Sequence, residues 1–177
     1  MKTLSRAIPT LAVAAALAAG ARASHPGGEE PAAPTLDRIK ALAGDWYVAD
    51  ENGAPTGALV SSYRVTAGGK AVLETIHPGT EMEMVTVYHQ DGDDLVLTHY
   101  CMLDNQPHYV ARNGERDGDL VFECQGASNL ESEDQAHMHR GSLRFDGPDR
   151  YESEWLLTEN GEVKERVANT LVRKKAN

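Results

Sequence analysis

Residues 84–101 read MVTVYHQDGDDLVLTHYC, and the turn dipeptide Asp91-Gly92 divides this segment into two halves. Both halves are rich in β-branched and aromatic residues, which favour strands. In the second half, Leu95 and Leu97 alternate with Val96 and Thr98. This period of two is typical of a strand with one buried face. The pattern predicts a β-hairpin with strands near 82–90 and 94–102.

The same pattern continues on both sides of this hairpin and predicts ten strands, near residues 44–49, 57–66, 70–77, 82–90, 94–102, 107–113, 118–125, 136–146, 149–158 and 162–173. Turn dipeptides such as Asn113-Gly114 and Asn160-Gly161 separate many of them. Short connections imply antiparallel neighbours, and a long meander exposes two edges unless it closes. We therefore expect residues 35–177 to form an all-β fold, an antiparallel up-and-down β-barrel of about ten strands. A two-sheet sandwich is the alternative.

The first 23 residues differ from the rest of the chain in composition. Lys2 and Arg6 precede an apolar run at 8–19, and small residues stand at 21 and 23. This is the pattern of a cleaved signal peptide, so residues 1–23 predict export to the periplasm or secretion. A retained anchor is the alternative, but the run is shorter than the roughly 20 residues that span a bilayer.

Two short segments connect this predicted leader to the strands. Residues 24–34 (SHPGGEEPAAP) combine Pro, Gly and Glu, which predicts a disordered linker. Leu36, Ile39 and Leu42 have the spacing of one or two helical turns, so a short helix is expected within 35–42.

The chain is acidic, with a formal net charge of −10 at pH 7. Cleavage after residue 23 would remove three positive charges and change this value to −13. A surface of this sign repels phosphate backbones, which argues against nucleic acid as a partner. No later segment is long and apolar enough to span a bilayer, so no stable membrane insertion is expected after cleavage.

Residues 42–46 (LAGDW), which follow the predicted helix and open the first strand, resemble the Gly-x-Trp start of lipocalin-like (calycin) proteins. A wider resemblance, over about residues 36–173, is to exported bacterial proteins of the uncharacterised DUF1579 type. It is carried by 83–89 (EMVTVYH), 98–101 (THYC), 105–107 (NQP), 128–130 (SNL) and 137–139 (HMH). The resemblance implies a calycin-type barrel and brings no established activity. Haem-binding nitrobindin-type barrels are a more distant likeness, and their iron-binding histidine has no matched position here.

Alternation predicts a polar cluster inside the barrel. The strand faces that carry Leu and Phe are the natural interior, and the residues expected to share those faces are His99, Cys101, Cys124, His137 and His139. The directions of the strands place all of them at one end of the barrel. We therefore expect a group of histidines and cysteines near one mouth of an otherwise apolar cavity.

Three interpretations of this cluster stay open. Cys101 and Cys124 could form a structural disulfide, but two strands separate them by roughly 9–10 Å, and a disulfide needs Cα atoms within about 7 Å. His99, His137 and His139 could hold a metal, either zinc with an open fourth position or haem iron. The histidines could also orient the polar end of a small ligand, with Asn129, Tyr151 and Trp155 as further ligand-binding candidates.

The sequence favours ligand binding over catalysis. It contains no Ser-nucleophile elbow, no phosphate-binding Gly loop and no HExxH helix. We expect an exported lipocalin-like barrel that binds a small apolar or amphipathic molecule in its interior. The alternative is a zinc- or haem-dependent protein or enzyme that uses His99, His137 and His139.

Overall fold

The computed structural model of the chain describes residues 33–174, so the predicted leader and nearly all of the predicted linker lie outside the described residues. The described part contains one α-helix, α1 (Leu36–Lys40), and a 3-10 turn at Ala67–Gly69. Ten strands follow α1: β1 (Gly44–Ala49), β2 (Pro55–Thr66), β3 (Ala71–Ile76), β4 (Met84–Asp91), β5 (Asp94–Tyr100), β6 (Gln106–Asn113), β7 (Leu120–Ser128), β8 (His137–Phe145), β9 (Arg150–Glu159) and β10 (Glu162–Arg173). In this part, no helix is both long and apolar enough to span a membrane.

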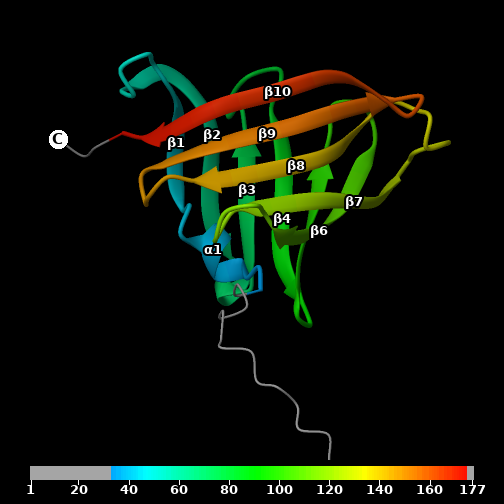
Figure 1. Cartoon of the computed structure of the whole chain (residues 1–177), viewed down its shortest axis with the longest axis horizontal. Coiled ribbons are helices and arrows are strands. Elements are labelled where there is room, and N and C mark those ends of the chain that lie inside the picture. Colours follow the sequence, from blue (N-terminus) through cyan, green and yellow to red (C-terminus); the bar gives the residue numbers. More distant parts are fainter. Residues whose placement is uncertain (1–32, 175–177) are drawn as a thin grey trace, which may run out of the picture. The chain divides into compact units, whose positions relative to one another are not determined.

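The ten strands form one closed antiparallel barrel (Figure 1). Each strand pairs with its neighbours in sequence, and β1 pairs with β10 to complete the ring. This closure removes the two edges that an open meander would expose. The predicted barrel and short helix are therefore confirmed, and the sandwich alternative is wrong.

The β4–β5 hairpin forms as its sequence predicts, with Asp91 paired to Asp94 and Gly92 at a φ of 58° in the turn. The predicted second strand was too long by two residues, because the chain turns at Cys101. There the backbone N–H of Cys101 donates to the carbonyl of Asn105 at 3.2 Å.

Helix α1 closes one end of the barrel, where Figure 1 places it beside the strands (lower end). Its apolar side chains Leu36 and Ile39 are buried in the core. Trp46 is buried beneath the helix, and its indole N–H donates to the carbonyl of Leu42 at 2.7 Å. The guanidinium of Arg173, on the last strand, lies 4.3 Å from the Trp46 ring centroid and donates to the carbonyl of Ala43 at 2.7 Å. The first and last strands are thus joined to the helix at the closed end.

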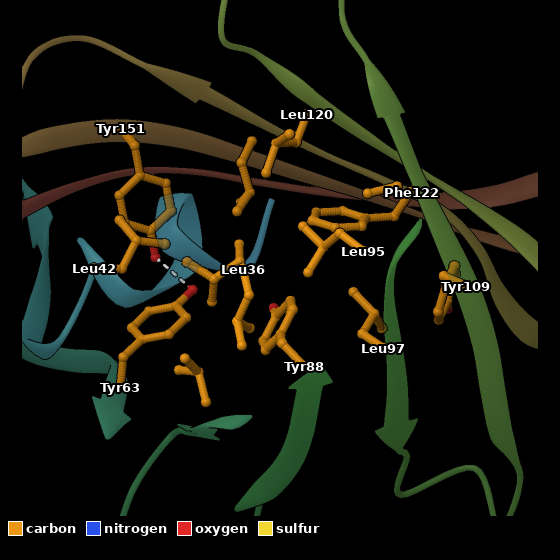
Figure 2. Packing of buried hydrophobic residues seen from close by; sticks show 14 of the residues in the cluster. Leu36, Leu42, Tyr63, Tyr88, Leu95, Leu97, Tyr109, Leu120, Phe122 and Tyr151 are labelled. Carbon is orange, nitrogen blue, oxygen red and sulfur yellow. Dashed lines mark hydrogen bonds between the residues drawn. The ribbon is translucent and has the colours of Figure 1, made fainter. Parts of the chain in front are cut away.

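The core fills the barrel from this closed end and contains several aromatic side chains. Tyr63 and Tyr151 point toward each other in Figure 2. Their hydroxyl oxygens are hydrogen-bonded at 3.1 Å. Phe122 and Trp155 stack with ring centroids 5.8 Å apart and planes only 3° from parallel. Gly141 lies between these two residues on β8 and is paired to both, so the absence of a side chain there lets the rings meet. Of these rings, Tyr63, Tyr151 and Trp155 line the cavity described next.

Candidate functional site

A cavity of about 260 Å³ extends from the core toward the end of the barrel opposite α1. Its lining residues include fully buried core residues such as Tyr88 and Tyr151 and exposed residues such as Met82 and Met102. Because Met82 is 52% exposed and Met102 is 59% exposed, these methionines mark the mouth, and the buried residues mark the floor. The wall between them is mainly apolar, with Ile76, Met84, Met138, Leu143, Trp155, Leu157 and Val167.

The floor carries a buried carboxyl group, Glu74 on β3. Ser61 donates to its Oε1 at 2.7 Å and Tyr88 donates to its Oε2 at 2.6 Å. Burial raises the pKa of Glu74, and the hydrogen bonds from Tyr88 and Ser61 oppose that shift without cancelling it. Each carboxyl oxygen can accept more than one hydrogen bond, and Glu74 lines the cavity, so a donor inside the cavity is a suitable further partner for it.

His99, at the end of β5, lines the wall of the cavity as the sequence predicts. Its Nδ1 lies 2.9 Å from the hydroxyl of Thr86 on β4, and its ring stacks on Trp155 with centroids 6.4 Å apart. Burial lowers the pKa of His99 to about 4, so the imidazole is neutral at pH 7. A neutral imidazole can donate or accept a hydrogen bond according to its tautomer.

A second group of candidate side chains lies at the rim, on β7 and β8. The possible ligand atoms of Cys124, His137 and His139 all lie within 4.8 Å of one another. His137 is buried, Cys124 is half-buried and His139 is exposed. We refer to these three residues as the rim cluster.

The structure therefore divides the predicted histidine cluster. His99 lines the cavity and is not part of the rim cluster, whereas His137 and His139 are absent from the cavity lining. The structure thus groups Cys124, and not His99, with His137 and His139, and the three-histidine metal site stays a prediction. His139 was expected to point inward but is exposed, since a β-bulge interrupts the alternation between Met138 and Arg140.

Of the other predicted site residues, some line the cavity and some do not. Tyr151 and Trp155 line the cavity. Asn129 does not: it is exposed at a φ of 56° in the loop after β7, and its side-chain amide donates to the carbonyl of Asp104. Cys101 and Cys124 are free thiols, so the disulfide that the sequence left open is not formed in this structure.

Haem does not fit the interior. A cavity of about 150 Å³ binds one benzene molecule, so the 260 Å³ found here is too small to enclose four linked pyrrole rings. No chemistry through haem follows from these residues.

Sequence reasoning missed Glu74, which is the strongest polar feature of the cavity. The sequence does indicate its burial, since Glu74 shares one face of β3 with the apolar residues Val72 and Ile76 on either side of it. A single acid between two inward-facing aliphatic residues indicates a buried carboxyl. Its partners Ser61 and Tyr88 come from the strands on either side and become visible only with the register known.

Searches against models of protein families, curated proteins and solved structures return no match. The resemblance to lipocalin-like proteins and to the DUF1579 type therefore stays a prediction.

Proposed function

We propose that this barrel binds a small amphipathic molecule in its interior. The observation that carries the proposal is the cavity of about 260 Å³ with an apolar wall and a buried carboxyl group at its floor. Small-molecule sites are usually concave, mostly apolar and equipped with a few convergent polar groups. Because about 150 Å³ accommodates benzene, this cavity suits a ligand of roughly ten non-hydrogen atoms, about the size of a fused bicyclic ring.

The lining also limits the charge of the ligand. Among the described residues that line the cavity, none is Arg or Lys, whereas Glu74 and Glu165 are acidic. A buried anion without a cationic partner is costly, so a ligand carboxylate is disfavoured beside Glu74. A hydroxyl, an N–H group or an ammonium would instead donate to the carboxyl oxygens of Glu74, while the apolar body of the ligand packs on Trp155.

Three probes with one scaffold and different charges test this proposal: indole, tryptamine and indole-3-carboxylate. We expect indole and tryptamine to bind the mature chain and the carboxylate to bind at least about 10-fold more weakly, a difference of about 1.4 kcal/mol. Isothermal titration calorimetry measures the affinities. In Glu74→Gln, the preference for tryptamine, the cation, over indole-3-carboxylate, the anion, should fall by about 10-fold.

Glu123→Gln is the matched control, because Glu123 is exposed on the outer face of β7. It should leave the affinities for all three probes unchanged. Tighter binding of the carboxylate than of the other two probes, or an unchanged charge preference in Glu74→Gln, would contradict the proposed ligand chemistry.

We also propose that the chain is an exported member of the lipocalin-like group, with residues 1–23 removed as a signal peptide. The charged start, the apolar run and the small residues at 21 and 23 support this proposal. Expression of the full chain in a Gram-negative host should yield a periplasmic protein whose measured mass corresponds to a chain that begins at Ser24. A cytoplasmic product that retains Met1–Ala23 would exclude it.

A further inference from the structure

The rim cluster owes its geometry to two β-bulges in neighbouring strands. On β7, Tyr109 faces Cys124 while His108 faces Gly126, so Gln125 is an extra residue. On β8, Met138 faces Leu157 while Arg140 faces Leu156, so His139 is an extra residue. Glu123 pairs with Arg140, and one further step along that register brings Cys124 opposite His139. Bulges of this kind redirect side chains at barrel rims and beside functional sites.

The bulge at His139 brings two imidazoles together that a regular strand would keep apart. Residues two positions apart in a regular strand are separated by roughly 6.5–7 Å. Here His137 Nε2 and His139 Nδ1 are 3.0 Å apart, with the ring planes at 71° to each other. The two nitrogens therefore converge on one point in space.

A backbone carbonyl determines the tautomer of His137. Its Nδ1 lies 2.7 Å from the carbonyl oxygen of Gln135. A carbonyl can only accept, so Nδ1 carries the proton and the lone pair lies on Nε2, which faces His139. Metal-ligating histidines usually donate their second ring N–H to a carbonyl or carboxylate in this way. This hydrogen bond is an observation independent of the clustering itself.

We propose that Cys124, His137 and His139 bind one Zn²⁺ ion, with a fourth position open to water. Zinc takes ligand bonds of about 2.0–2.1 Å to imidazole nitrogen and about 2.3 Å to thiolate, which separates neighbouring ligand atoms in a tetrahedron by roughly 3.3–3.7 Å. The observed separations within 4.8 Å need only small side-chain rotations to reach this geometry. Imidazole and thiolate favour zinc over magnesium or calcium, which prefer oxygen ligands. On binding, the Cys124 thiol releases its proton to solvent and the sulfur bonds to the metal.

The site is separate from the proposed ligand cavity, because none of its three residues lines that cavity. It is also separate from Cys101, which does line the cavity. Failure of the metal proposal would therefore leave the small-molecule proposal standing, and the reverse also holds.

The test uses the mature chain, reduced and freed of metal by a chelator. Titration with Zn²⁺ in competition with a chromophoric chelator should give one ion per chain. Replacement by Co²⁺ should give a sulfur-to-cobalt charge-transfer band in the near ultraviolet, which reports the Cys124 ligand directly. Because loss of a group that only orients a ligand costs 10–100-fold in affinity, Cys124→Ser and His139→Gln should each weaken Zn²⁺ binding by at least about 100-fold.

His139 is exposed, so His139→Gln tests the site without disturbing the core. Cys101→Ser and His89→Gln are the matched controls, since they remove a thiol and an imidazole outside the rim cluster, and both should bind Zn²⁺ like the unmodified chain. A stoichiometry near zero in the reduced chain would overturn the proposal. So would a cobalt charge-transfer band that survives in Cys124→Ser, or a Zn²⁺ affinity that is unchanged in His139→Gln.

Discussion

At the scale of single residues, His99 is the group whose environment has the clearest consequence. Its side chain is buried between Thr86 and Trp155, and burial lowers its pKa to about 4 from an unfolded value near 6.5. Between these two pH values the unfolded chain binds a proton that the folded chain does not. Folding stability therefore falls as pH decreases from about 6.5 to about 4, and His99 contributes no pH dependence above that window.

The variant His99→Gln can still hydrogen-bond to Thr86 but has no imidazole to titrate. We therefore expect it to lose less stability than the unmodified chain as pH decreases from about 6.5 to about 4. The difference between the two chains should grow to about 3 kcal/mol at pH 4. Urea unfolding at a series of pH values measures it, with His89→Gln as the control that removes an exposed imidazole from the neighbouring strand. Parallel stability curves for the unmodified chain and His99→Gln would show that the imidazole titrates freely in the folded state.

Glu74 shows where prediction from residues alone stops. Its inward position follows from alternation with Val72 and Ile76, so its burial could be foreseen. Its two hydrogen-bond donors could not, because they depend on the registers of β2 and β4 against β3. The same holds for His99 and Thr86, which are 13 residues apart in sequence and directly opposite in the β4–β5 register.

At the scale of elements, Gly141 on β8 controls the wall of the cavity. A methyl group there would overlap the six-membered ring of the Trp155 indole. Gly141→Ala should therefore displace Trp155, break its stacking on Phe122 and cost about 1–3 kcal/mol of stability, the range found for overpacked cores.

The measurement for Gly141→Ala is chemical unfolding together with the emission maximum of tryptophan, which should shift as Trp155 moves. Gly57→Ala is the matched control, because the added methyl group meets no atom within 4 Å. Equal stability in the two variants, with unchanged emission, would mean that the aromatic wall accommodates the methyl group.

Bulges explain why the elements were predicted better than the site. Strand counting from turn dipeptides locates ten strands correctly, since Gly92 and Gly161 adopt the positive φ angles that such turns require. The prediction of which side chains point inward assumes strict alternation along a strand. One extra residue therefore reverses the predicted direction of every later side chain in that strand. The bulge at His139 is such a residue, and nothing in the local sequence HMHRG distinguishes it from a regular strand. The inward direction expected for His139 was wrong for this reason, although its proximity to Cys124 was predicted.

At the scale of the molecule, closure could be inferred because a ten-strand meander has no other way to remove its edges. The short connections between strands make every neighbour in sequence a neighbour in space. What the sequence does not contain is the depth to which the core fills the barrel. That depth depends on how Tyr63, Tyr88, Tyr151 and Phe122 interlock, and it determines the volume that remains for a ligand.

The contacts of Arg173 with Ala43 and Trp46 have a practical consequence for handling this protein. They bring the last strand against the segment that follows α1, so the described chain enters and leaves the barrel at its closed end. A fusion partner, affinity handle or immobilising surface joined directly to the described chain, next to Ala33 or Lys174, would be attached at the end opposite the methionine-lined entrance. The entrance would then face solution, which suits this scaffold to sensors and display formats in which the analyte must arrive unobstructed.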